Sequence, residues 1–139
     1  MSATPTTNGL VGLLLVSHSA AIADGLAEFV GQVAGPDVAI VAAGGGPDGT
    51  LGTDGRRVLD GLRSLAGGAG GVVLMDLGSS VLSVRAALQE LDESQSEQIV
   101  VVDAPFVEGA IAAGVAASIG GSRDDVAAAA LEARGAYKL

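Results

Sequence analysis

The chain has 139 residues, a length typical of one domain, and 49% of them are hydrophobic although only 2% are aromatic. Its formal net charge is −9, and its seven Lys and Arg residues are scattered singly or in one pair, which excludes the basic stripe that nucleic-acid binding requires. The absence of cysteine excludes disulfides and thiolate sites, and a single histidine excludes a histidine-rich metal site. We therefore expect a globular domain with an aliphatic core, an acidic surface and no zinc site.

Small polar residues open the chain, and we expect residues 1–9 to form a disordered leader before a single domain at residues 10–139. The apolar run at 10–16 is too short to span a membrane, and it lacks the preceding basic region of a signal peptide. We expect no membrane association and a cytoplasmic location.

Apolar runs of strand length alternate with stretches of helical periodicity along the chain. Strands are expected at residues 10–16, 38–43, 72–76 and 99–102, with a first helix over 20–34 and further helices after residues 54, 78, 105 and 122. Strict alternation of buried strands with helices predicts an α/β fold, a three-layer sandwich whose mainly parallel sheet has helices on both faces.

Two helices carry large apolar residues at helical spacing. The first helix has Ile22, Leu26, Phe29, Val30 and Val33 at helical spacing, and the helix after residue 105 carries Val107, Ile111, Val115 and Ile119. Pro105 can set the start of the latter helix. Exposure of Phe106 and Val107 there would indicate a contact surface, and burial within the same chain is the alternative.

The only histidine, His18, lies between Ser17 and Ser19, where the first strand gives way to a turn and a helix. In an open α/β sheet, chemistry takes place outside the carboxyl ends of the strands. An imidazole there can act as a base or a nucleophile, and the unpaired N–H groups that begin the next helix would favour a phosphate beside it. The alternative is a surface-turn histidine that only caps this helix.

Asp76 ends the third predicted strand. If the first and third strands are neighbours, Asp76 lies beside His18. A carboxylate that accepts a hydrogen bond from one ring nitrogen fixes the tautomer and leaves the other nitrogen free to attack. The alternative is that Asp76 only caps the third helix.

Two loops could contribute to the same site. Gly78, Ser79 and Ser80 offer backbone and hydroxyl donors for an anion at a helix start, although such residues are also ordinary in turns. The glycine-rich loop at 44–54 is no P-loop, because no Lys follows its glycines, and it is mainly a crossover in which Thr53 and Asp54 are possible contributors. The chain also lacks the GxGxxG of dinucleotide-binding domains and the GxSxG of serine hydrolases.

Four segments, VSHSAAIADG, GGGPDGTLGTD, LMDLGSS and APFVEGA, occur in this order. Together they resemble the phosphotransferase subunit of bacterial phosphoenolpyruvate-dependent dihydroxyacetone kinase, whose domain is similar to the IIA domain of the mannose-class sugar phosphotransferase system (PTS). The resemblance covers residues 10–134 and rests on the four segments jointly.

The resemblance implies a phosphoryl carrier with a sheet of strand order 2-1-3-4. His18 matches the family's phosphorylated histidine and Asp76 its partner aspartate, with Ser17, Ser19, Gly78, Ser79 and Ser80 around the phosphoryl group. The donor would be an HPr-type phosphocarrier protein, and the acceptor would be ADP on the nucleotide-binding kinase subunit DhaL, which serves a third subunit that binds dihydroxyacetone.

The same resemblance implies that this chain binds no cofactor or metal, because ADP or ATP and its Mg²⁺ belong to the partner subunit, and that it forms a homodimer. Some relatives continue into carrier-protein domains, so we expect this chain to need separate donors. The alternative function is a mannose-class IIA component of a sugar-transporting PTS. Because two partners must dock in turn, we expect an apolar face around His18, with charge elsewhere, as at Asp92-Glu93 and Asp124-Asp125.

Overall fold

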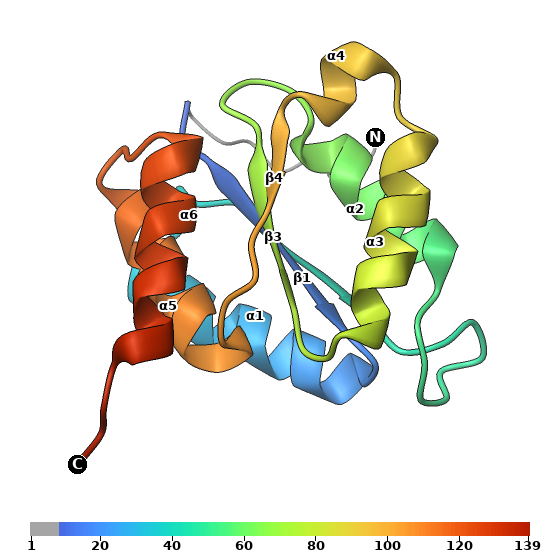
Figure 1. Ribbon diagram of the computed structural model, residues 1–139, viewed down its shortest axis with the longest axis horizontal. Helices are drawn as coiled ribbons and strands as arrows, with labels where there is room; N and C mark the ends of the chain where they lie inside the picture. Colours follow the sequence, from blue (N-terminus) through green and yellow to red (C-terminus); the bar gives the residue numbers. More distant parts are fainter. Residues whose placement is uncertain (1–8) are drawn as a thin grey trace.

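The computed structural model of the chain describes residues 9–139 and has the expected α/β architecture (Figure 1). Within those residues, one parallel sheet contains β1 (Gly12–Ser17), β2 (Ile40–Gly44), β3 (Gly71–Met75) and β4 (Ile99–Val101), in the order β2-β1-β3-β4. The implied 2-1-3-4 order is therefore confirmed. Apart from Gly9, the predicted leader lies outside the described residues.

Helices cover both faces of the sheet, which gives the three expected layers. One face carries α1 (Ala20–Ala34), α5 (Phe106–Ser118) and α6 (Arg123–Glu132), and the other carries α2 (Gly55–Leu65) and α3 (Ser79–Gln89) (Figure 1). The sequence did not predict the short α4 (Glu93–Ser96) before β4, nor the 3₁₀ turn η1 (Ala133–Gly135) after α6. None of the helices between residues 9 and 139 is both long and apolar enough to cross a membrane.

The central strand β1 is buried along its whole length because helices pack on both of its faces. Leu13 and Leu15 face α1, α5 and α6, whereas Leu14 and Val16 face α2 and α3. Each fully buried leucine contributes about 1.5–3 kcal/mol relative to an exposed one. The strand that leads to His18 is thus anchored from both sides.

The apolar residues at helical spacing on α1 and α5 are only partly buried. On α1, Leu26 and Val30 are buried, but Ile22, Phe29 and Val33 are about half exposed. On α5, Ile111 is partly buried, whereas the outward side carries Val107, Val115 and Ile119. The buried residues of α5 are small: Gly109, Ala110, Ala113, Gly114 and Ala117.

Close approach of backbones explains this arrangement of α5. A Cβ atom at Gly114 would lie 2.7 Å from the Cγ1 atom of Val30, so α1 and α5 pack at a distance that only a residue without a side chain permits. Periodicity alone places the large residues inside, but this interface requires the small ones. The large residues therefore remain on the surface.

Gly44, the last residue of β2, packs against the start of α1, which begins two residues after His18. A Cβ atom there would lie 2.6 Å from the carbonyl oxygen of Ser19 and 2.7 Å from the Cβ of Ala23. We expect Gly44→Ala to lower the free energy of unfolding by about 2 kcal/mol, measured by urea denaturation, because backbone atoms cannot move aside cheaply. Gly25→Ala is the control, since its Cβ would meet nothing within 4 Å in mid-helix and should raise the free energy of unfolding by about 0.5–1 kcal/mol. Equal effects of the two substitutions would refute this account.

Candidate active site

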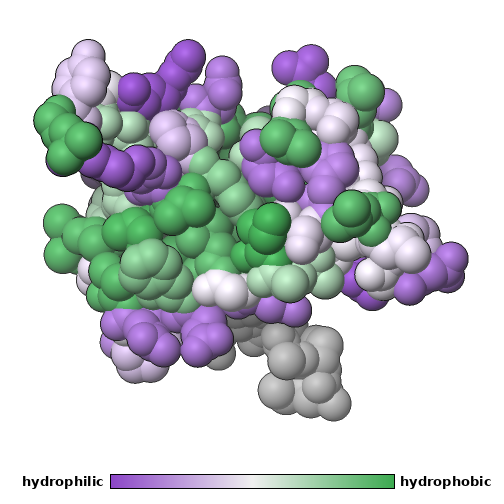
Figure 2. All heavy atoms as spheres, turned by 90° about the horizontal axis from the view of Figure 1, so that it is seen from below, coloured by the Kyte–Doolittle hydropathy of each residue, from purple (hydrophilic) through white to green (hydrophobic). Residues whose placement is uncertain are grey.

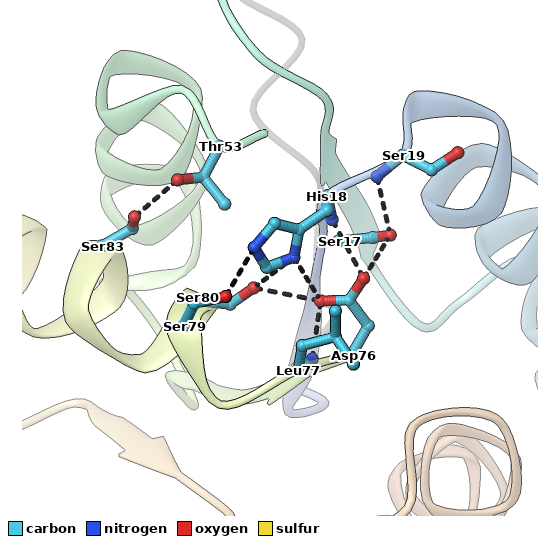
Figure 3. Close-up of polar contacts among 9 residues, drawn as sticks. All are labelled: Ser17, His18, Ser19, Thr53, Asp76, Leu77, Ser79, Ser80 and Ser83. Atoms are coloured by element: carbon cyan, nitrogen blue, oxygen red, sulfur yellow. Dashed lines mark hydrogen bonds and ion pairs between the residues drawn. The ribbon is translucent and has the colours of Figure 1, made fainter. Parts of the chain in front are cut away.

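His18 and Asp76 meet where two neighbouring parallel strands end. Val16 pairs with Met75 in the β1–β3 register, so the residues that follow each strand emerge at the same edge of the sheet. The Nδ1 atom of His18 lies 3.0 Å from the Oδ1 atom of Asp76 (Figure 3). The His18 side chain is 25% exposed and the Asp76 side chain 14%, so the pair is partly covered but reachable from solvent.

The Asp76 carboxylate accepts five hydrogen bonds. Its Oδ2 accepts from the His18 peptide N–H at 3.0 Å and the Ser17 hydroxyl at 2.9 Å. Its Oδ1 accepts from His18 Nδ1 at 3.0 Å, the Ser80 hydroxyl at 3.0 Å and the Leu77 peptide N–H at 2.7 Å. Burial alone would raise the pKa of Asp76, but hydrogen bonds from His18, Ser17 and Ser80 outweigh it and lower the pKa from 3.8 to about 2.

The ionised carboxylate fixes the tautomer of the imidazole. A carboxylate without a proton can only accept hydrogen bonds, so the proton of the His18–Asp76 contact is on Nδ1. In the neutral ring the lone pair that can attack an electrophile is then on Nε2. The Ser79 hydroxyl lies 2.7 Å from Nε2 and donates to it in this tautomer. The nitrogen with the lone pair, Nε2, therefore points to the start of α3.

The first turn of α3 places Ser79 and Ser80 beside the ring (Figure 3). Gly78 is the N-cap residue, and no side chain caps this helix. The Ser80 hydroxyl, 3.2 Å from Nδ1, is buried and donates to Asp76, whereas Ser79 is exposed beside Nε2. Ser79 and the helix start thus face the open side of the ring, and Ser80 supports its inner side.

Ser17 and Ser19 support the site rather than face its open side. Ser17 is fully buried, and its hydroxyl donates to Asp76 and accepts from the Ser19 peptide N–H at 3.0 Å. The Ser19 hydroxyl caps α1 by accepting from the Ile22 peptide N–H. These bonds hold Asp76 and the start of α1, and a contact of either serine with a phosphoryl group stays a prediction.

The glycine-rich loop after β2 fastens the backbone beneath the imidazole. The Gly45 N–H donates to the Ser17 carbonyl at 3.1 Å, and the Gly52 N–H donates to the His18 carbonyl at 2.9 Å. Both glycines have a positive φ, +83° and +137°, which favours glycine. This role was not predicted from the sequence, although the density of glycine in the loop was its signal.

Thr53 and Asp54 lie at the end of this loop, and their observed bonds lead away from the imidazole. The Thr53 hydroxyl is 2.6 Å from that of Ser83 on α3, and Asp54 caps α2 and lies 3.7 Å from the Arg57 guanidinium. Both therefore position the loop. Among residues 9–139, no group of three or more His, Cys, Asp or Glu side chains could hold a metal ion.

Comparison with known proteins shows which family the chain belongs to. Residues 12–127 match the EIIA-man family, described as the PTS system fructose IIA component. The chain belongs to the EIIA-man family.

Relatives of this EIIA-man chain are named as phosphoryl donor subunits, DhaM, of phosphoenolpyruvate-dependent dihydroxyacetone kinases. The chain is 34% identical to one from Listeria innocua, over 84% of this chain and 94% of that protein. It is 40% identical to one from Providencia stuartii, over 84% of this chain, and 36% identical to one from Escherichia coli, over 90% of this chain. It spans only 25% and 28% of those two proteins, respectively.

A solved structure shares the EIIA-man chain's fold. It is the crystal structure of a protein of unknown function, 35% identical in sequence, with a TM-score of 0.78 over 88% of this chain and 94% of that one. Together with the strand order, this match supports the fold predicted from the sequence.

The low pKa of Asp76 predicts how acid affects the stability of this EIIA-man domain. A carboxyl whose pKa falls on folding stabilises the fold above its unfolded pKa of 3.8, and this contribution is lost as the pH falls towards 2. The lowering corresponds to about 2–3 kcal/mol. We expect Asp76→Asn to lower the free energy of unfolding at pH 7 and the difference from wild type to shrink between pH 4 and pH 2, measured by urea denaturation. A difference that is independent of pH would contradict this role.

Proposed function

We propose that this chain is a phosphoryl donor subunit of a phosphoenolpyruvate-dependent dihydroxyacetone kinase and carries the phosphoryl group on Nε2 of His18. The observation that carries the proposal is the hydrogen bond from Nδ1 to the ionised Asp76, which leaves Nε2 as the nucleophile. Membership of the EIIA-man family and the names of the relatives support the substrate class.

In the first step, Nε2 attacks the phosphorus of a phosphohistidine on the donor, an HPr-type phosphocarrier protein. A new N–P bond forms at Nε2 while the N–P bond of the donor breaks, and the Nδ1 proton stays in place. In the second step, a terminal oxygen of ADP on the nucleotide-binding subunit DhaL attacks the same phosphorus. The N–P bond to His18 then breaks, ATP forms and the neutral imidazole returns.

Asp76 acts on the ring rather than on the phosphoryl group. Phosphorylation of Nε2 while Nδ1 keeps its proton leaves positive charge on the imidazole. The carboxylate 3.0 Å from Nδ1 stabilises that charge and keeps the ring from turning. Because five donors hold the carboxylate, it needs no reorganisation during the reaction.

The start of α3 would hold the phosphoryl oxygens. Ser79 donates to the lone pair of Nε2 in the free protein, and this hydroxyl can donate to a phosphoryl oxygen once Nε2 carries phosphorus. The N-terminus of α3, which no side chain caps, adds the favourable end of a helix dipole for an anion. Positioning and electrostatics of this kind account for most of the catalysis of phosphoryl transfer.

Nucleotide and metal belong to the acceptor in this proposal. This chain would bind no cofactor, and ADP or ATP with its Mg²⁺ would arrive on DhaL. A homodimer and a cytoplasmic location remain predictions. The alternative, a IIA component that serves a sugar transporter, keeps the same chemistry on His18 and has the broader family description in its favour, whereas the three named relatives favour dihydroxyacetone.

His18→Ala should abolish phosphorylation of this chain, because no other side chain occupies the position of Nε2. Intact-mass spectrometry after incubation with phosphoenolpyruvate and the PTS donor proteins measures the labelled fraction. Adding the two other kinase subunits and dihydroxyacetone measures the complete transfer. Equal labelling of His18→Ala and wild type would refute the assignment, and labelling without transfer to dihydroxyacetone would favour the sugar-transport alternative.

Asp76→Asn should slow phosphorylation of His18 at least about tenfold, since the amide lacks the charge that stabilises the phosphorylated ring. Its NH₂ group would also face donors whichever way it turns, because both carboxylate oxygens accept hydrogen bonds. Rapid-quench labelling measures the rate. Asp124→Asn, an exposed acid at the start of α6, is the control and should leave the rate unchanged. Equal rates for the two variants would reduce Asp76 to a structural residue.

A further inference from the structure

An apolar groove lies between α1, α5 and α6, on the face of the sheet that these three helices cover. Its volume is about 560 Å³, and its lining is made of Phe29, Val107, Glu108, Ile111, Ala112, Ala129, Glu132, Ala133 and Ala136. Phe29 is 53% exposed and Val107 45%, so large apolar side chains stand in solvent here. Figure 2, which views the molecule from below, shows a broad hydrophobic area on the side of α5 and α6, bordered by hydrophilic residues.

Two routes lead from this groove towards the site around His18, and each carries an exposed apolar side chain. Along α1, Ile22 is exposed in the first turn, and Phe29 is exposed two turns further on. At 1.5 Å per residue, Phe29 lies about 14 Å along the helix from Ala20. On the other flank, exposed Leu77 lies with Ala104 in a small pocket beside Asp76, and α5 with Val107 begins shortly after. A protein that contacts His18 through a patch of ordinary size, about 800 Å² or roughly 30 Å across, reaches the groove.

Charge selects among the possible occupants. Acidic side chains that line the groove or pair with its rim outnumber basic ones by one: Asp103, Glu108 and Glu132 against Arg134 and Lys138. Lys138 pairs with Glu108 at 2.7 Å, and Arg134 lies 3.7 Å from Asp103, which leaves an acidic excess. A second copy of this chain would set like charges against each other, and a nucleotide-bearing acceptor would bring further negative charge. A basic, apolar protein surface is the best complement.

We infer that the groove and the apolar residues beside His18, Ile22 and Leu77, form one docking face for the protein that delivers the phosphoryl group. That donor would place an apolar anchor in the groove between Phe29 and Val107, ringed by Lys or Arg side chains that face Glu132. The inference rests on the proposed function, because it is transfer to His18 that requires a protein at this edge of the sheet.

Substitutions on one helix test the anchor. Val107→Glu should raise the KM for the phosphorylated HPr-type carrier at least tenfold, because it puts a charge where an apolar side chain docks. Ile119→Glu is the matched control, since Ile119 is 82% exposed at the far end of α5, and its KM should stay within twofold of wild type. Phosphoramidate, a small donor that needs no docking surface, gives a reference rate for each variant. Circular dichroism and thermal melting confirm that each variant is folded.

Charge reversal tests the rim. Glu132→Lys should raise the same KM about threefold, whereas Asp124→Lys at the other end of α6 should not. An unchanged KM for both Val107→Glu and Glu132→Lys would overturn the docking face while leaving the proposed function intact. A selective loss of transfer to DhaL would assign the face to the acceptor, and a change in sedimentation would assign it to a second copy; either result overturns the inference. Failure of wild-type His18 to accept phosphoryl from the carrier would instead overturn the proposed function itself.

Discussion

The hydrogen bond between Nδ1 of His18 and the Asp76 carboxylate is the interaction on which the site depends. It joins the ends of β1 and β3, and it works only because both strands are parallel, adjacent and in the observed register. Five donors converge on one carboxylate and hold it ionised. Because the ionised oxygen can only accept a hydrogen bond, the proton of the neutral ring is on Nδ1, and Nε2 carries the lone pair. Sheet topology thus decides which nitrogen of the neutral ring carries the proton and which carries the lone pair.

The surrounding elements hold His18 in position for this hydrogen bond. Leucines on both sides of β1 fix the strand, and the close packing of Gly44 on the start of α1 fixes the turn that follows it. The glycine-rich loop then ties down the carbonyls of Ser17 and His18. Within residues 9–139, no buried side-chain nitrogen or oxygen lacks a hydrogen-bond partner. The ring is therefore oriented by the fold and does not depend on a ligand for its position.

Much of this arrangement could be predicted from the sequence, for identifiable reasons. The apolar runs fixed the strands, and a lone histidine and an aspartate at the ends of two such runs fixed the candidate pair. The partners of Ser17 could not be predicted, because a serine in a turn donates equally well to a ligand or to a neighbouring carboxylate. The orientation of α5 could not be predicted, because the apolar period follows its large residues, whereas the contact at Gly114 requires a residue without a side chain.

The two sides of α5 carry out separable tasks. Its small inner residues set the spacing between helix and sheet, and enlarging them would force backbones apart. Its large outer residues, Val107, Val115 and Ile119, are 44% to 82% exposed, so exchanging them costs less packing than exchanging the inner ones. The buried residues of α5 therefore affect the stability of the fold, whereas its exposed residues are available to contact another protein. A lineage could retune which protein it meets in a few surface steps while its interior stays the same.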